Sequence, residues 1–168
     1  MARVLKVEPL LDVLDNHEVA YIVIGGFAVA AHGFVRATKD LDICPDPRRA
    51  NLRRLADALD ELEATPMDLE EFAGELDLEP DYEGLRRGGN WALNTKHGRL
   101  DILQTFQFED VEDLGEYSHI AGMAEERDFR GHQVRFCSYE DLLRMKRAAG
   151  RTLDQVDIES LKAARSEL

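Results

Sequence analysis

The sequence predicts an α/β fold, with a small mixed β-sheet whose helices pack mainly on one face. Short apolar runs rich in β-branched residues, such as 20–24, are typical of buried strands. Longer stretches with apolar residues at helical spacing, such as 52–62, predict amphipathic helices that turn one face to the core. Because both patterns occur within 1–110, strands and helices are expected to share one core there.

The expected strands are bounded by glycine and proline. Gly25 and Gly26 end the first apolar run, and Pro45 closes the second. Two later pairs of runs turn at Gly98 and Gly131, which are hairpin signals. The expected strands are 20–24, 41–44, 91–95, 99–104 and a hairpin over 129–137.

The expected helices lie between and after these strands. Pro9 fits the first turn of a helix near the N-terminus, where its missing N–H is harmless. Ser138 and Thr152 are predicted N-caps of two closing helices, with Gly150 between them. The other expected helices are 27–32, one over 52–62 and a short one near 68–76.

Length and composition predict a single domain over 1–168, with the α/β core in 1–110 and a hairpin and C-terminal helices in 111–168. No apolar run is long enough to span a bilayer, and the first residues lack the apolar segment of a signal peptide. A cytoplasmic protein without membrane contact is expected. Cys44 and Cys137 follow no metal-ligand spacing and fit a reduced pair.

The formal net charge of −13 narrows the choice of partners. Such a field repels polyanions and disfavours non-specific binding of nucleic acid, which depends on phosphate neutralisation by lysine and arginine. A nucleic-acid substrate would need a local basic patch. A bound triphosphate would need cations.

The segment 22–43 carries the residues that predict chemistry. A buried strand ends at Gly25-Gly26, where the backbone can approach a phosphate closely, although such turns also occur for packing alone. Asp40 and Asp42 follow on the next strand, and because side chains alternate along a strand, both carboxylates share one face.

Asp101 adds a third carboxylate in another apolar strand. If the two strands are neighbours, three carboxylates converge, and their mutual repulsion is relieved by a cation. Oxygen donors of this kind suit Mg²⁺, with Mn²⁺ as the alternative, and two such ions can hold the attacking and leaving oxygens of an in-line displacement. In the other interpretation Asp40 and Asp42 cap a turn, and Asp101 only forms a salt bridge.

Together, Gly25-Gly26, the spacing to Asp40-x-Asp42 and the later Asp101 resemble the signature of the DNA polymerase β-like nucleotidyltransferase superfamily. The resemblance covers about residues 20–45, 97–104 and 137–162 and leaves 63–90 unmatched.

The phrase Arg36-x-Thr38-x-Asp40-x-Asp42 is similar to the minimal bacterial branch of that superfamily. The branch includes abortive-infection toxin nucleotidyltransferases of the AbiEii type, found in toxin–antitoxin systems, and more distantly lincosamide-type antibiotic nucleotidyltransferases. The closing segment 141–158 resembles it too.

The resemblance implies a palm-like nucleotidyltransferase fold and transfer of a nucleoside monophosphate from a nucleoside triphosphate, such as ATP, to a hydroxyl acceptor on RNA, protein or a small molecule. Asp40 and Asp42 would bind the metal ions, two Mg²⁺ being expected, that hold the triphosphate. Asp101 would bind the second ion and help to deprotonate the acceptor hydroxyl.

Further candidates flank these aspartates. Arg36, Thr38 and Lys39 precede the metal strand and are candidates for phosphate contacts, with a solvated loop as the alternative. Lys146 and Asp157 each interrupt the apolar stripe of a closing helix. They could form a structural ion pair, or Lys146 could reach the triphosphate while Asp157 orients it, as the family pattern favours.

Two other classes of function compete with an enzyme. A non-catalytic nucleotide- or partner-binding module, such as a regulatory protein of a toxin–antitoxin-like system, would bind a protein partner; the presence of all three aspartates argues against a decayed site. An α/β domain with merely acidic surface residues would show no metal dependence in any property.

Overall fold

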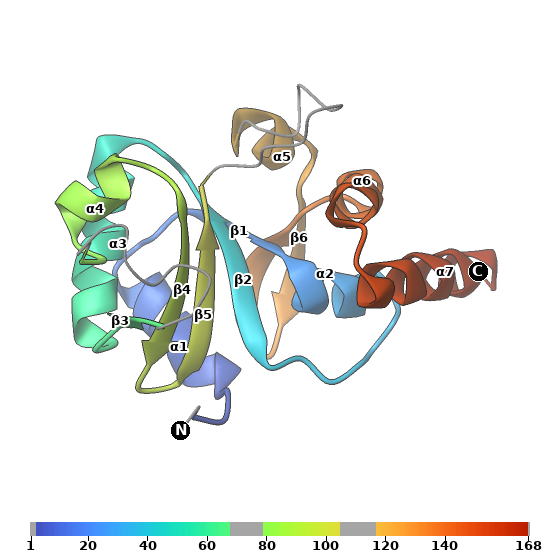
Figure 1. Cartoon of the computed structure of the whole chain (residues 1–168), viewed down its shortest axis with the longest axis horizontal. Helices are drawn as coiled ribbons and strands as arrows, with labels where there is room; N and C mark the ends of the chain where they lie inside the picture. The colour runs from blue at the N-terminus through green and yellow to red at the C-terminus, as the bar shows by residue number, and fades with distance from the viewer. Residues whose placement is uncertain (1–2, 68–78, 105–116, 168) are drawn as a thin grey trace.

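The computed structural model describes residues 3–67, 79–104 and 117–167. The strands in these ranges are β1 (Tyr21–Ile24), β2 (Asp40–Pro45), β3 (Thr65–Pro66), β4 (Asn90–Thr95), β5 (Gly98–Leu103), β6 (Glu125–Phe129) and β7 (His132–Phe136). They form one mixed sheet in the order β3-β4-β5-β2-β1-β7-β6 (Figure 1). β2 therefore lies in the middle of the sheet, although it is only the second strand in the chain.

The pairing of β2 with its two neighbours positions the acidic residues. β2 runs parallel to β5 and antiparallel to β1. In this register Asp42 is opposite Asp101, and Asp40 is opposite Arg99. Since side chains alternate along each strand, these four residues share one face of the sheet, and the apolar residues between them share the other.

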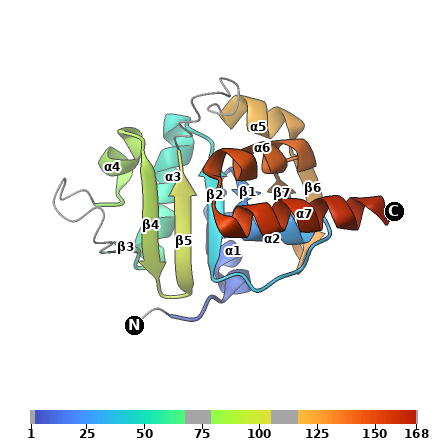
Figure 2. The same ribbon diagram turned by 45° about the vertical axis from the view of Figure 1, so that its right-hand side comes forward.

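Five of the described helices form two groups beside the sheet. The helices are α1 (Val7–Asn16), α2 (Gly25–Ala31), α3 (Arg49–Glu61), α4 (Tyr82–Arg86), α5 (Tyr117–Met123), α6 (Tyr139–Ala149) and α7 (Thr152–Ser166). α1 and α3 contact each other behind β4 and β5, whereas α2, α6 and α7 gather at the β1 and β7 end of the sheet (Figures 1 and 2). No helix among the described residues is both long and apolar enough to cross a membrane.

The apolar core lies between α1, α3 and the sheet. Leu10 and Leu14 of α1, Leu55 and Leu59 of α3, and Ile43 of β2 are all fully buried. The opposite face of β2 and β5 carries the aspartates and stays partly open. Burial of one face thus fixes the register, because a shift of one residue would place the carboxylates in the core.

The predicted α/β class with a mixed sheet is confirmed, as is the hairpin over β4 and β5. The cap at Ser138 is also confirmed, since its Oγ accepts from the Asp141 N–H at 3.1 Å. The second hairpin turns where predicted, but its first strand starts at Glu125 rather than at Phe129.

The prediction of Thr152 as an N-cap was wrong. Arg151 occupies that position, and its N–H donates to the Asp154 carboxylate at 3.1 Å, so the cap interaction runs from the third helical residue backwards. The helix expected near 68–76 lies outside the described residues.

Candidate functional site

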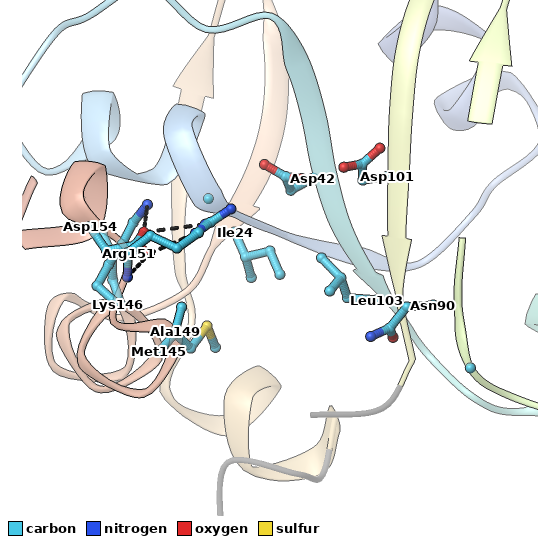
Figure 3. Close-up of a pocket in the computed structure, with 13 residues that line it drawn as sticks. Ile24, Asp42, Asn90, Asp101, Leu103, Met145, Lys146, Ala149, Arg151 and Asp154 are labelled. Atoms are coloured by element: carbon cyan, nitrogen blue, oxygen red, sulfur yellow. Dashed lines mark hydrogen bonds and ion pairs between the residues drawn. The ribbon is translucent and has the colours of Figure 1, made fainter. Parts of the chain in front are cut away.

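Three carboxylates converge on the open face of the sheet. Asp40, Asp42 and Asp101 each offer an oxygen, and these oxygens all lie within 4.8 Å of one another. Asp40 and Asp42 are alternate residues of β2, and the neighbouring parallel strand β5 supplies Asp101. The structure therefore brings together the acidic residues that the sequence singled out, and Figure 3 shows Asp42 and Asp101 side by side at one end of a cavity.

Arg99 is the cation closest to this cluster. Its guanidinium donates two hydrogen bonds of 2.8 Å to the two oxygens of Asp101, and its Nε lies 3.7 Å from Oδ2 of Asp40. One positive charge thus faces three carboxylates. The carboxylate of Asp42 has no hydrogen-bond or ion-pair partner among the residues that the structure describes.

The electrostatics of the cluster follow from this imbalance. Burial, and then the charges of Asp40 and Asp101, raise the pKa of Asp42 to about 8, against a smaller opposing effect of Lys146 and Arg99. Burial also raises the pKa of Asp101, although its hydrogen bonds from Arg99 act in the opposite direction. The cluster therefore carries more negative charge than the protein alone neutralises.

The two glycines at the end of β1 leave room for this cluster and the loop beside it. Gly25 has φ +68°, and a Cβ built on it would lie 2.1 Å from Oδ2 of Asp42. A Cβ on Gly26 would lie 2.8 Å from Cγ2 of Thr38. Both glycines belong to α2, which starts two residues earlier than the sequence predicted, so the backbone at the start of this helix lies directly beside Asp42.

A cavity of about 680 Å³ opens beside the carboxylates, a size that suits a nucleotide-sized ligand. Asp42 and Asp101 lie at one end, and Lys146 and Arg151 lie across from them (Figure 3). The remaining lining is mostly apolar or small: Ile24, Gly25, Gly89, Asn90, Leu103, Leu142, Met145, Ala149 and Asp154.

The cationic wall is held in place by α7. Lys146 is buried, and its Nζ lies 3.1 Å from Oδ1 of Asp154 and 2.9 Å from Oδ2 of Asp157. Arg151 donates from Nε to Asp154 at 2.8 Å. This hydrogen bond, together with the charges of Asp42 and Asp40, raises the pKa of Arg151, so the guanidinium is within electrostatic reach of the carboxylates.

None of the three loop residues predicted to meet phosphates, Arg36, Thr38 and Lys39, lines the cavity. Arg36 donates from Nε and Nη2 to Asp157 at 2.8 and 3.0 Å, which ties the loop to α7. The Thr38 hydroxyl donates to the Arg36 carbonyl at 3.3 Å. Lys39 is exposed and pairs with no side chain in the described ranges. Asp157 forms ion pairs with Arg36 and Lys146 but does not line the cavity.

Sequence reasoning missed three residues of the site. Arg99 lies two positions before Asp101 on the same strand face, and that spacing was the available signal. Arg151 and Asp154 are three positions apart at the start of α7, a spacing that brings helical side chains together. Their relation to Lys146 depends on how α6 and α7 pack, which no local pattern reveals.

The donor set fits a divalent cation. Three carboxylates offer the hard oxygen ligands that Mg²⁺ and Mn²⁺ prefer. The single charge of Arg99 leaves the three carboxylates with a formal excess of negative charge, and burial together with the neighbouring carboxylates raises the pKa of Asp42 to about 8. A bound divalent ion would neutralise the excess negative charge and would lower the pKa of Asp42.

Neither a known protein family nor a curated protein matches the chain by sequence. Solved structures match its fold. The lincosamide antibiotic adenylyltransferase LnuA with lincomycin bound has a TM-score of 0.61 at 16% identity, over 96% of this chain and 99% of the other. The antibiotic-resistance factor ANT(2'')-Ia has a TM-score of 0.58 at 18% identity, over 96% and 81%.

A third match is a nucleotidyltransferase-like protein from Paracoccidioides brasiliensis, with a TM-score of 0.52 at 18% identity, over 94% of this chain and 77% of the other. At these identities the likeness concerns the fold. The chain therefore has the fold of nucleotidyltransferases, antibiotic adenylyltransferases among them.

Proposed function

We propose that this chain is a metal-dependent nucleotidyltransferase that moves a nucleoside monophosphate from a nucleoside triphosphate to a hydroxyl acceptor. One observation carries the proposal. Asp42 and Asp101 stand at one end of a cavity of about 680 Å³, and Lys146 and Arg151 stand across from them. A ligand that brings divalent cations and an extended polyanion matches both ends of such a cavity.

The carboxylates have distinct roles in this proposal. Asp40 and Asp42 would hold one divalent cation together with the triphosphate, and Asp101 would contribute to a second. When bound, the cations supply charge neutralisation at the phosphates and a lower pKa for the acceptor hydroxyl. The protein itself contributes positions: the parallel pairing of β2 and β5 fixes the three carboxylates before any ligand arrives.

The reaction is an in-line displacement at the α-phosphorus. The acceptor oxygen forms a bond to phosphorus, and the bond from phosphorus to the bridging oxygen of the leaving group breaks. Pyrophosphate leaves with that electron pair. The proton of the acceptor hydroxyl passes to the Asp101 carboxylate, which lines the cavity from β5 and whose pKa is raised by burial.

Lys146 and Arg151 would bind the outer phosphates. Both residues line the cavity, and Asp154 pairs with both. Lys146 is buried at its position, whereas the Arg151 side chain is 74% exposed and can adjust to a ligand. Against the opposing effect of burial, hydrogen bonds from Arg151 and Lys146 lower the pKa of Asp154 and keep it ionised. At the other end of the cavity, Gly25 lets a ligand come close to the backbone beside Asp42.

The candidate acceptors come from the solved structures and from the sequence. LnuA was solved with lincomycin and ANT(2'')-Ia with adenylyl-2''-tobramycin, which makes hydroxylated antibiotics one class to test. Assignment to the abortive-infection branch, with RNA or protein as acceptor, rests on the phrase from Arg36 to Asp42 and on the closing segment 141–158.

A transfer assay tests the proposal. The protein is incubated with Mg²⁺, each nucleoside triphosphate labelled on its α-phosphate, and a panel of lincomycin, tobramycin, total RNA and protein. Label transferred by the wild type and lost in Asp101→Asn is the expected result. Metal-dependent triphosphate binding without transfer to any acceptor class would instead favour the non-catalytic binding module.

A further inference from the structure

We infer that Arg99 is the resident counter-ion of the carboxylate cluster: it occupies Asp101 while no divalent ion is bound and thereby weakens the affinity of the cluster for metal. The inference deepens the proposed function and rests on it, because it concerns how the same site takes up its cation.

The geometry places Arg99 where a metal ion would have to act. Its two hydrogen bonds of 2.8 Å engage both oxygens of Asp101, and its Nε lies 3.7 Å from Oδ2 of Asp40. A two-pronged guanidinium–carboxylate pair of this kind is among the stronger side-chain interactions. A metal ligated by Asp101 must therefore share that carboxylate with Arg99 or displace it.

The backbone keeps Arg99 at this position. Arg99 and Asp101 are two residues apart on β5 and point to the same face of the sheet, and Arg99 is opposite Asp40 in the register with β2. About a third of the Arg99 side chain is exposed, with a relative exposure of 35%, against 16% for Asp101. The Arg99 side chain is thus the more exposed partner of the pair, and it can move away from the carboxylate into solvent.

The three carboxylates consequently differ in how free they are. That of Asp42 has no hydrogen bond or ion pair in the described part of the chain. That of Asp40 has one long contact with Arg99 and a hydrogen bond with Asp101, and Asp101 also accepts both hydrogen bonds from Arg99. A first divalent ion should engage Asp42 and Asp40, and Asp101 should join once Arg99 gives way. Arg99 offsets part of the carboxylate repulsion in the metal-free protein at the expense of metal affinity.

The direction in which one substitution changes the metal affinity distinguishes this role of Arg99 from a structural one. Arg99→Gln removes the competing charge, so its affinity for Mn²⁺ should rise roughly tenfold, given the strength of charge interactions at a partly exposed site. If Arg99 were purely structural, its loss would instead lower the metal affinity. Arg99→Lys keeps the charge and loses the two-pronged contact, so its affinity should lie between the two.

The test is a calorimetric Mn²⁺ titration of the full chain, with a thermal melt of each variant in EDTA and in Mn²⁺. Arg165→Gln is the matched control, since it makes the same charge change and breaks an exposed ion pair to Glu140 far along α7. In EDTA both Arg99 variants should melt at a lower temperature than the wild type. Mn²⁺ should close that gap, and the control should bind Mn²⁺ as the wild type does.

The outcomes separate the inference from the proposed function. Wild-type Mn²⁺ binding that neither Arg99 variant tightens would overturn the inference and leave the proposed function standing. No Mn²⁺ binding by the wild type or by either variant would contradict both. If Arg99→Gln fails to fold without metal, Arg99→Lys still decides, because weaker or unchanged Mn²⁺ binding in that variant contradicts a competing cation.

Discussion

Gly25 lies directly against the carboxylate of Asp42: a Cβ built on Gly25 would be 2.1 Å from Oδ2. The two residues come from different elements, the start of α2 and the middle of β2, and the antiparallel pairing of β1 with β2 brings them together. Gly25 also has φ +68°, a conformation in which a side chain costs about 1 kcal/mol or more. The glycine and the carboxylate therefore form one unit of the site.

Gly25→Ala should displace the Asp42 carboxylate and lower Mn²⁺ affinity by at least about tenfold, since a shifted ligand loses most of its contribution to a metal site. Gly131→Ala is the matched control, because Gly131 has φ +86° but no atom within 4 Å of the added Cβ. Both variants should lose similar stability from the backbone term, measured by chemical denaturation. Unchanged metal affinity in Gly25→Ala would contradict the assigned role of Asp42.

The raised pKa of Asp42 predicts how metal-free stability changes with pH. The folded protein holds a proton on Asp42 up to about pH 8, whereas the unfolded chain releases it near the ordinary value of 3.8. Raising the pH across this window therefore favours unfolding, by at most about 1.4 kcal/mol per pH unit. Denaturation in EDTA at several pH values should show this slope in the wild type and a flatter one in Asp42→Asn. A slope of equal steepness in the variant would assign the titration to other groups.

Lys146→Gln separates a phosphate role from a structural one. A lysine that contacts the triphosphate contributes a charge-assisted hydrogen bond of about 1.5–3 kcal/mol, so the variant should bind a non-hydrolysable triphosphate more than tenfold less tightly. Lys162→Gln, on the exposed surface of α7, is the control. Loss of stability with no loss of triphosphate affinity would reduce Lys146 to the ion pair that joins α6 and α7.

Asp157→Ala should destabilise the protein more than any exposed acidic substitution. Asp157 is fully buried and pairs with both Arg36 and Lys146, so its removal leaves Arg36 without its partner and costs about 3–5 kcal/mol. Glu140→Ala removes an exposed pair with Arg165 and should cost less than about 1 kcal/mol. Urea denaturation of the two variants checks the difference, and equal effects would contradict the structural role of Asp157.

Much of the fold could be predicted because the strands and helices carry strong local patterns. The alternation around Asp40 and Asp42 placed both on one face, and the apolar runs located the strands. The approach of Asp101 was conditional, because strand order depends on contacts distant in sequence. The error at Thr152 has a local cause: Asp154 at the third helical position caps the preceding residue, so the helix begins one residue earlier than the threonine suggested.

The missed residues of the site share one property, which is that their roles depend on tertiary packing. In the sequence Arg99 looks like any arginine of a strand, and its contact with the carboxylates follows only from the pairing of β5 with β2. Arg151 is exposed between two helices, and only the packing of α7 against α6 places it at the cavity. Neither relation is visible as periodicity.

Binding of a metal–triphosphate complex by the aspartates is the basis of the proposed function. Its most direct test is calorimetric titration of Mg²⁺ with a non-hydrolysable nucleoside triphosphate into the wild type and into Asp40→Asn/Asp42→Asn. Asp57→Asn/Asp60→Asn, on the exposed face of α3, makes the same charge change away from the site. We expect Mg²⁺-dependent binding in the wild type and the control and none in Asp40→Asn/Asp42→Asn. Binding of equal strength in all three proteins, or no binding by the folded wild type, would contradict the account.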